Sequence, residues 1–253
     1  MGKIIAFANQ KGGVGKTTSA VNIAASVGIQ GKNVLLIDLD PQGNTTSGVG
    51  INKKNLKASS YEILIDEISA EKAIIKTEFK NLSVIPSNIS LAGAEFDLYQ
   101  LDEREYRLKK QLESIKDQYD YIFIDCPPSL GMITVNALAA ADAVIIPMQC
   151  EYYALEGLSQ LMLTIRKIKQ LYNAELEICG ILITMFNGRL ILTMQVISEL
   201  KKYYSDKLFK TPISRNVKLS EAPSFGTPVY YHDKSSKGAK EYLDVAKELI
   251  NRI

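Results

Sequence analysis

The sequence predicts an α/β fold in which helices flank a doubly wound, mostly parallel sheet. Short apolar runs rich in β-branched residues alternate with longer amphipathic segments, as strands and helices alternate in such folds. The strand-like runs are apolar on both faces, which is typical of strands buried within a parallel sheet. No repeat, low-complexity tract or long Gly/Pro-rich linker divides the chain, so residues 1–253 are expected to form a single domain.

Hydrophobic periodicity places the expected elements along the chain. The strand-like runs are 3–8, 33–38, 82–86, 121–125, 143–148 and 178–184. Helical patterns are clearest at 16–29, 104–118, 130–141, 154–172, 190–204 and 237–252. The last helix has a row of apolar residues at core-facing spacing: Ala239, Tyr242, Leu243, Ala246, Leu249, Ile250 and Ile253. This spacing predicts that the last helix packs against the rest of the domain.

The composition indicates a folded, soluble protein. Hydrophobic residues make up 46% of the chain and charged residues 23%, and no run approaches the ~18 apolar residues of a membrane span. The N-terminus leads straight into a strand-like run without a charged-then-apolar leader, so a cytoplasmic location is expected. Cys126, Cys150 and Cys179 form no C-x-x-C pair, so we expect reduced, buried thiols and neither a disulfide framework nor a zinc site.

The net charge of +2 conceals an uneven distribution of charge. Residues 1–150 carry −2 and residues 151–253 carry +4, and the stretch 160–218 holds ten basic and four acidic residues. Such an excess most often marks a solvated helix face. It is also the pattern of a weak binder of nucleic-acid phosphates, so both interpretations remain open from charge alone.

A glycine-rich loop follows the first strand-like run. In "NQKGGVGKTTS", Gly15, Lys16 and Thr17 fit the phosphate-loop pattern G-x-x-x-x-G-K-[ST], but Gln10 stands at the position of the first glycine. Backbone N–H groups of such a loop, with the following helix N-terminus, cradle phosphates. Lys16 is expected to reach the β- and γ-phosphates and Thr17 to place its hydroxyl on Mg²⁺. A turn that only caps a helix does not require this pattern, so a P-loop NTPase fold is expected.

Two other strand-like runs end in aspartate. "LLIDLDPQGN" places Asp38 and Asp40 beside the glycine loop, where Asp40 is expected to orient the attacking water or to hold the water shell of the metal. "YIFIDCPPS" is four apolar residues followed by Asp125, the pattern of a Walker B strand, so Asp125 is expected to contact Mg²⁺ directly or through water. Acidic residues often end strands without any chemistry, so both expectations depend on the neighbouring loop.

Several segments together resemble the ParA/Soj family of chromosome- and plasmid-partitioning ATPases, within the deviant Walker A group that also includes MinD. These segments are "KGGVGKTT" (11–18), "DLDPQGN" (38–44), "DCPPSLG" (125–131), "PMQCEYYALEGL" (147–158) and "RNVKLSEAPSFG" (215–226). The resemblance covers nearly the whole chain. The first segment is shared by the whole group, so the last one discriminates better.

The resemblance implies slow hydrolysis of ATP to ADP and phosphate with Mg²⁺, and a homodimer that forms with ATP. Lys11 matches the family's extra lysine, which crosses the dimer interface to the partner's nucleotide phosphates. Lys11, Lys16 and Asp40 are the expected catalytic residues, and Thr17 and Asp125 the expected metal residues. The expected nucleotide contacts are Lys11, Gly12, Gly13, Val14, Gly15, Lys16, Thr17, Thr18, Ser214 and Asn216. A lysine that is poorly compensated in a dry interface makes dimerisation depend on ATP.

The resemblance also implies that the ATP dimer binds double-stranded DNA without sequence preference and associates with the nucleoid. Arg189 and Lys218 match the family positions that carry this binding, in agreement with the basic stretch. A ParB-like partner is expected to accelerate hydrolysis.

Two segments depart from the family pattern. The family's D-x-R-T-N-L is Asn187-Gly188-Arg189-Leu190-Ile191-Leu192 here, which keeps the arginine and loses its polar neighbours. The family's I-P-R-N-V has Ser214 in place of the proline and keeps Asn216, which matches an adenine contact.

Two alternative classes can be distinguished. A MinD-like ATPase that cycles on membranes requires a basic amphipathic tail beyond the last core helix. Neither such a tail nor a stable membrane anchor is expected here. An iron–sulfur protein of the superfamily requires paired cysteines, which the lone Cys126 does not provide. His232, the only histidine, is expected in a loop without an assigned role.

Overall fold

The computed structural model of the protein describes residues 2–253. These residues contain a single seven-stranded sheet. The strands lie in the order β3-β4-β2-β5-β1-β6-β7, and all neighbours are parallel except β3 and β4. Their bounds are β1 Lys3–Phe7, β2 Val34–Asp38, β3 Ile75–Lys76, β4 Leu82–Ile85, β5 Tyr121–Asp125, β6 Ala143–Gln149 and β7 Glu177–Thr184. The predicted doubly wound, mostly parallel sheet is confirmed.

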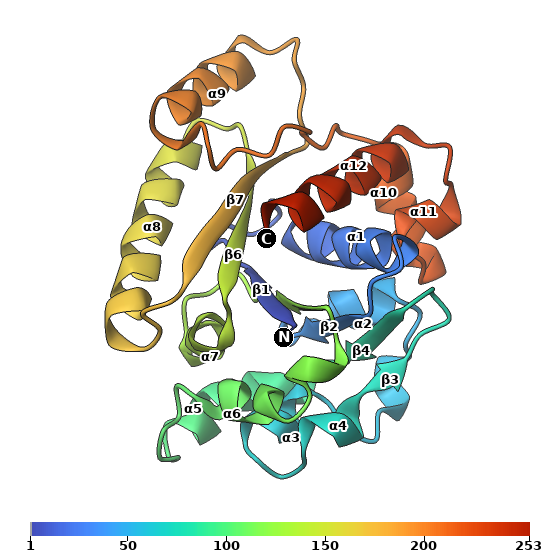
Figure 1. The fold of residues 1–253 in the computed structure, drawn as a ribbon, viewed down its shortest axis with the longest axis vertical. Helices are drawn as coiled ribbons and strands as arrows, with labels where there is room; N and C mark the ends of the chain where they lie inside the picture. Colours follow the sequence, from blue (N-terminus) through green and yellow to red (C-terminus); the bar gives the residue numbers. More distant parts are fainter. Residues whose placement is uncertain (1) are drawn as a thin grey trace.

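Helices cover both faces of this sheet (Figure 1). The α-helices are α1 Lys16–Ile29, α2 Asn44–Gly48, α3 Ser60–Leu64, α4 Ala70–Ala73, α5 Ala94–Leu98, α6 Arg107–Glu113, α7 Met132–Ala140, α8 Ala154–Leu171, α9 Ile191–Tyr204, α10 Val217–Glu221, α11 Val229–His232 and α12 Lys237–Arg252. Four 3₁₀ turns, η1 Lys53–Asn55, η2 Ile89–Gly93, η3 Lys116–Gln118 and η4 Ala222–Phe225, join them.

Two separate hydrophobic cores fill the space between the sheet and its helices. On one face, residues of α1 and α12 pack against the sheet, and the hydroxyls of Ser19 and Tyr242 lie 3.2 Å apart. The other face is covered by helices that include α7 and α8. Alternate side chains of a strand point to opposite faces, so strands that are apolar throughout can serve both cores.

The register of the central strands brings the predicted aspartates together. Asp125 pairs with Phe7 on one side and with Asp38 on the other, so β1, β2 and β5 end at the same edge. After β1 the chain forms β2 on one side of β1, and later it forms β6 on the other side. The direction of strand addition therefore changes at β1, and ligands of open α/β sheets bind at such a topological switch point.

The structure confirms the six predicted strands and changes several details. The short antiparallel strand β3 and the short helices were not expected from periodicity. The helix expected over 104–118 is shorter, because only Arg107–Glu113 is α-helical before a 3₁₀ turn. In α12 the apolar row is mostly buried against α1, whereas Ile253 is 38% exposed. The three cysteines are unpaired, and only Cys126 is fully buried.

Candidate nucleotide site

The glycine loop joins β1 to α1 at the carboxyl edge of the sheet. Gly13 and Gly15 have φ angles of 73° and 82°, in the left-handed region that residues with a Cβ rarely adopt. Gly15 directly precedes α1, so the unpaired N–H groups of the first helical turn lie at the end of the loop. This geometry is that of an anion cradle.

Lys16 is buried at the base of this cradle, with 6% of its surface exposed. Its ammonium group donates to the carbonyl of Lys11 at 3.2 Å, across the loop. Burial lowers the pKa of Lys16, and the nearby carboxylate of Asp125 counteracts this effect. A buried cation whose hydrogen bond goes to one carbonyl retains donors for a phosphate.

The two carboxylate oxygens of Asp125 differ in their hydrogen bonding. Its Oδ2 accepts the hydroxyls of Thr17 at 2.8 Å and Thr45 at 2.7 Å, while the buried Oδ1 has no hydrogen-bond partner among residues 2–253. Burial raises the pKa of Asp125 to about 7; Asp38 adds to the rise, and the Thr45 and Thr17 hydroxyls oppose it. A carboxylate oxygen and a threonine hydroxyl in contact are donors that suit Mg²⁺.

Asp38 supports the neighbouring helix α2. Its Oδ2 accepts the backbone N–H and the hydroxyl of Thr46, at 2.8 and 2.7 Å. Burial raises the pKa of Asp38 to about 6, and the Thr46 hydrogen bonds oppose the rise. Thr45 and Thr46 were missed from sequence, although "NTTS" after the D-x-D run offers hydroxyls at the predicted site.

Asp40 lies at a tight turn after β2 and is partly exposed. Its Oδ1 accepts the N–H of Gln42 at 2.9 Å, and its carbonyl accepts the N–H of Gly43 at 2.8 Å. The carboxylate contributes to the electrostatic environment of Lys16. Its position beside the cradle leaves it able to receive a hydrogen bond from a water molecule.

The segment before the cradle is attached to β6 and to the β6–α8 connection. The side chain of Asn9 accepts from the N–H of Lys11 at 3.0 Å and donates to the carbonyl of Pro147 at 2.8 Å. The Lys11 ammonium group forms an ion pair with Glu151. Within one chain, therefore, Lys11 has a carboxylate partner, and sequence reasoning did not single out Glu151.

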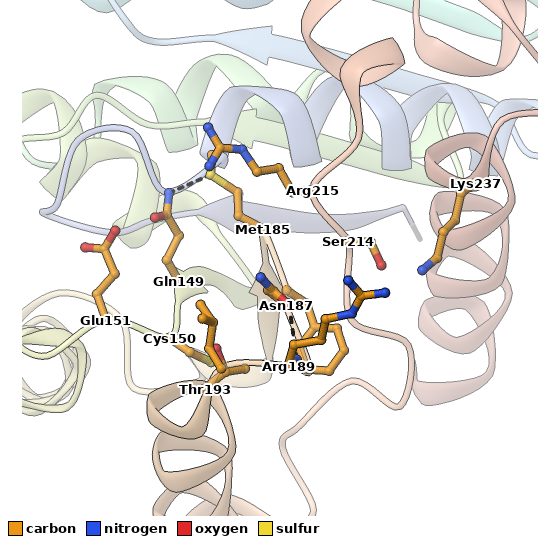
Figure 2. Close-up of a pocket in the computed structure, with 13 residues that line it drawn as sticks. Gln149, Cys150, Glu151, Met185, Asn187, Arg189, Thr193, Ser214, Arg215 and Lys237 are labelled. Carbon is orange, nitrogen blue, oxygen red and sulfur yellow. Dashed lines mark hydrogen bonds between the residues drawn. The ribbon is translucent and has the colours of Figure 1, made fainter.

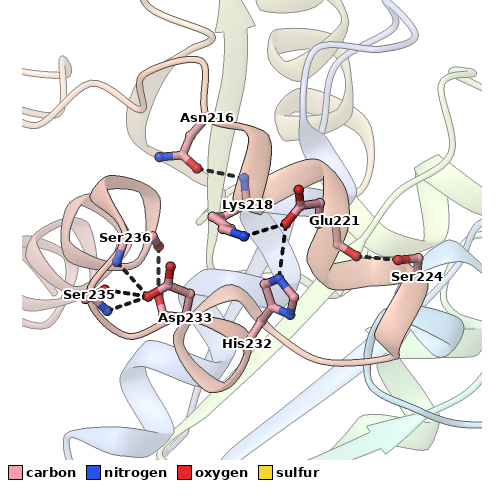
Figure 3. Close-up of polar contacts among 8 residues, drawn as sticks. All are labelled: Asn216, Lys218, Glu221, Ser224, His232, Asp233, Ser235 and Ser236. Atoms are coloured by element: carbon pink, nitrogen blue, oxygen red, sulfur yellow. Dashed lines mark hydrogen bonds and ion pairs between the residues drawn. The ribbon is translucent and has the colours of Figure 1, made fainter.

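A small cavity of about 150 Å³ lies between the cradle and the segment that follows Ile213. Gly15, Thr18, Ser214 and Asn216 are among its lining residues, so the structure brings four of the predicted nucleotide contacts together. Asn216 Oδ1 caps α10 by accepting the N–H of Lys218, and its amide nitrogen points away from that helix (Figure 3).

Ser214 is attached to α12. Its N–H and hydroxyl donate to the two carboxylate oxygens of Glu241, at 2.8 and 2.7 Å. The hydroxyl oxygen can accept a further hydrogen bond. The replacement of the family's proline by Ser214 therefore adds a direct connection between this segment and the last helix.

A second hollow, of about 540 Å³, opens beside the cradle and is bordered by three cationic side chains (Figure 2). Arg189 and Lys237 extend toward it from the loop before α9 and from α12, and Arg215 lies at its edge. The side-chain amide of Gln149 donates to the carbonyl of Gly13 at 2.6 Å, which joins this hollow to the glycine loop.

The two predicted DNA contacts lie in different surroundings. Arg189 is exposed, and its side chain forms no ion pair within residues 2–253. Lys218 forms an ion pair with Glu221, at 2.8 Å. The positive charge of this region is therefore partly neutralised at Lys218. The excess of basic residues in the sequence did not reveal this pairing.

Residues 2–253 contain no group of three or more His, Cys, Asp or Glu side chains placed to hold a metal ion. Mg²⁺ at nucleotide sites needs only one or two carboxylates besides phosphates and water, a requirement that Asp125 with Thr17 can meet. Within the same range, every helix is too short or too polar to cross a membrane.

Comparison with known proteins identifies close relatives over the full length. A family model described as an AAA domain matches residues 2–178. The sporulation initiation inhibitor protein Soj of Bacillus subtilis is 56% identical over 98% of both chains. The chromosome partitioning protein ParA of Myxococcus xanthus is 49% identical, covering 100% of this chain and 89% of its own.

Solved structures agree with these relatives. A structure titled cobyrinic acid a,c-diamide synthase, from Mycobacterium smegmatis with ADP and magnesium, has a TM-score of 0.87 and 37% identity over 99% of this chain and 95% of its own. A putative plasmid partition protein of Borrelia burgdorferi bound to AMPPNP has a TM-score of 0.83 and 31% identity over the whole of both chains. The cell division ATPase MinD of Pyrococcus furiosus has a TM-score of 0.83 and 25% identity over 99% of both chains.

The parallel sheet and the glycine cradle with its buried lysine define a P-loop nucleotide-binding protein. Sequence identities of 56% to Soj and 49% to ParA, over nearly the whole length, assign the chain to one family within this class. The chain belongs to the ParA/Soj family of partitioning ATPases.

Proposed function

We propose that this chain is an ATP-hydrolysing switch for DNA partitioning. ATP with Mg²⁺ forms a homodimer that binds double-stranded DNA on the nucleoid without sequence preference, and hydrolysis to ADP and phosphate, accelerated by a ParB-like protein, resets it. The whole chain acts as one such ATPase domain. The observation that carries the proposal is the juxtaposition of buried Lys16 and the unpartnered oxygen of Asp125 at the glycine cradle.

Lys16 holds the β- and γ-phosphates through its ammonium donors, and the N–H groups from Gly12 to Thr18 surround them. Thr17 and Asp125 would hold Mg²⁺ through the hydroxyl and the unpartnered Oδ1. When bound, Mg²⁺ neutralises charge that develops on the phosphate oxygens. Because both the lysine and the aspartate are buried before ligand binds, their charges act in a region with little competing water.

Asp40 orients the attacking water. The water oxygen forms a bond to the γ-phosphorus, the bond from that phosphorus to the bridging oxygen breaks, and its electron pair stays on ADP. One proton of the water remains on the released phosphate and the other passes to solvent. The Asp40 carboxylate accepts a hydrogen bond from the water, and its own contact with the Gln42 N–H at 2.9 Å fixes its position. Ser214 and Asn216 contact the base in the small cavity.

Lys11 connects nucleotide state to dimerisation. Its side chain leaves Glu151 and crosses to the phosphates of the partner's nucleotide when two ATP-bound chains meet. The half-exposed position of both side chains, 45% for Lys11 and 51% for Glu151, makes this exchange inexpensive because neither group is deeply desolvated. ADP has less negative charge to compensate Lys11 in a dry interface, so the ADP form is monomeric.

Arg189 and Lys218 bind DNA phosphates in the dimer. Contacts to phosphates carry no sequence information, so affinity depends on salt and not on sequence. A membrane-cycling function is the alternative. The apolar face of α12 is buried against α1, so this helix offers no apolar surface for a lipid interface.

Oligomeric state and DNA binding measured with two nucleotides test this proposal. With a non-hydrolysable ATP analogue and Mg²⁺, sedimentation velocity should show a dimer, and fluorescence anisotropy should show equal affinity for two unrelated duplexes. With ADP, both signals should be lost. Lys11→Ala is the control, since it should bind the analogue and remain monomeric.

Two results would refute the proposal. A monomer with the ATP analogue would remove the dimer switch. Equal, weak DNA binding with both nucleotides would remove the DNA function, and binding to anionic vesicles in the ATP state would then favour the membrane alternative.

A further inference from the structure

Glu221 contacts two basic side chains through a single carboxylate oxygen (Figure 3). Its Oε2 lies 2.8 Å from the ammonium group of Lys218, one turn earlier on α10. The same oxygen lies 3.4 Å from Nε2 of His232, at the end of α11. His232 is thus part of a polar cluster and not the unassigned loop residue expected from sequence.

Neighbouring contacts hold this cluster in place. The Glu221 carbonyl accepts the hydroxyl of Ser224 at 2.6 Å, which fixes the end of α10. The ring of Phe225 stacks on His232, with centroids 5.0 Å apart and planes inclined by 30°. The imidazole ring and the backbone at the end of α10 are therefore each held by a contact outside the Glu221–His232 pair.

A second carboxylate nearby does not replace Glu221. Asp233 accepts from the N–H and hydroxyl of Ser235, at 2.9 and 2.6 Å, and from the N–H of Ser236 at 3.2 Å. These contacts belong to its own turn. The ion pair with Lys218, and then the His232 contact, hold the pKa of Glu221 below its usual range, and Glu221 raises the pKa of Lys218.

We propose that Glu221 competes with DNA phosphates for Lys218 and thereby limits the DNA affinity of the ATP dimer. This inference rests on the proposed function, because it assumes that Lys218 contacts DNA. A phosphate oxygen and the Glu221 carboxylate require the same ammonium donors in similar geometry. Binding must break or share an ion pair in each chain of the dimer, so every encounter with DNA is weakened and release is made faster.

The size of this effect follows from the exposure of the pair. Both side chains are over 40% exposed, and exposed pairs of this kind change an equilibrium by up to about five-fold. Removing the competing carboxylate should therefore raise DNA affinity about three-fold for each chain, and about ten-fold for a dimer. A freed Lys218 also adds one phosphate contact with full counterion release, which steepens the salt dependence by up to ~0.9 per chain.

Glu221→Gln tests the proposal, because glutamine keeps the size and loses the charge. Anisotropy of a labelled duplex of arbitrary sequence, with a non-hydrolysable ATP analogue across a salt series, should show about ten-fold tighter binding and a steeper slope by up to ~2. Two controls separate this from a general charge effect. Asp244→Asn breaks the comparable exposed pair with Lys247 on α12 and should change affinity little. Glu221→Gln combined with Lys218→Gln should lose the gain.

Several outcomes would overturn the inference. Unchanged affinity and slope in Glu221→Gln would do so while leaving DNA binding itself intact. An equal gain in Asp244→Asn, or a gain that persists without Lys218, would show that net charge and not competition is responsible. If the unmodified protein bound no DNA with either nucleotide, the proposed function would fail and this inference with it. Thermal unfolding of each variant verifies that it is folded.

Discussion

Lys11 and Glu151 form an ion pair within one chain, which joins the segment before the glycine cradle to the segment before α8. The side-chain amide of Asn9 adds a second connection, because it donates to the carbonyl of Pro147 in β6, the strand that leads into the segment of Glu151. A lysine bound to its own carboxylate must leave it before it can reach a second nucleotide. Glu151 therefore opposes dimerisation in the proposed switch.

Glu151→Gln should promote the ATP-dependent dimer. Loss of the carboxylate frees Lys11 in both chains of the dimer. At about three-fold for each chain, half-dimerisation with the ATP analogue should occur at a protein concentration about ten-fold lower. Sedimentation equilibrium measures this. Glu156→Gln, which removes a charge from an exposed position in the first turn of α8, is the matched control. An unchanged or weaker dimer in Glu151→Gln would contradict the role of this pair.

Lys16→Ala should abolish nucleotide binding, because the β/γ-phosphates lose the cation at the base of the cradle. Titration calorimetry with the ATP analogue and Mg²⁺ measures the affinity. Lys54→Ala changes an exposed lysine of η1 and should bind normally. ATP affinity retained in Lys16→Ala would remove the phosphate-cradle assignment.

Asp40→Ala should bind ATP and dimerise but hydrolyse at least about 100-fold more slowly. The variant removes a carboxylate that orients water and leaves Lys16, Thr17 and Asp125 in place. Single-turnover hydrolysis and sedimentation velocity provide the two readouts. If the variant failed to dimerise with ATP, Asp40 would instead support the structure or the metal.

Arg189→Ala with Lys218→Ala should weaken DNA binding equally on unrelated duplexes while ATP-dependent dimerisation persists. Each phosphate contact contributes ~0.9 to the slope of log affinity against log salt. Four lost contacts per dimer flatten the slope by up to ~4, and by about 2 if Glu221 already neutralises Lys218. A salt series of anisotropy measurements tests this. An unchanged slope would mean that the basic stretch is only a solvated face.

Asp38 should make the stability of the nucleotide-free protein depend on pH. Burial raises the pKa of Asp38 from 3.8 to about 6, so between these values the folded state binds more protons than the unfolded state. The free energy of unfolding should therefore fall as the pH rises from about 4 to about 6, by on the order of 3 kcal/mol from this group.

Thermal unfolding from pH 4 to pH 7 with a chelator present measures this effect. The free energy of unfolding of Asp38→Asn should fall less steeply with rising pH than that of the unmodified chain, since the amide does not titrate. If stability fell equally with pH in the two proteins, Asp38 would not be the source of the pH dependence. The comparison is needed because Asp125, with its pKa raised to about 7, contributes in the same direction in both.

The sequence by itself determined the sheet, the cradle and the family. Runs such as Tyr121–Ile124 are short, apolar and rich in β-branched residues, a pattern typical of a strand buried on both faces. The glycines and Lys16 were recognisable because left-handed backbone and a phosphate-binding cation restrict the residues allowed at those positions. These are local requirements, which a single stretch of sequence records.

Only the tertiary structure decided which charges neutralise one another. Glu151 lies 140 positions from Lys11 and Thr45 lies 80 positions from Asp125, so no local pattern relates them. The pair of Lys218 with Glu221 is local, but its contact with His232 depends on how α11 packs beside α10. Hydrogen bonds and ion pairs require atoms within a few ångströms, and chain folding, not sequence spacing, sets those distances.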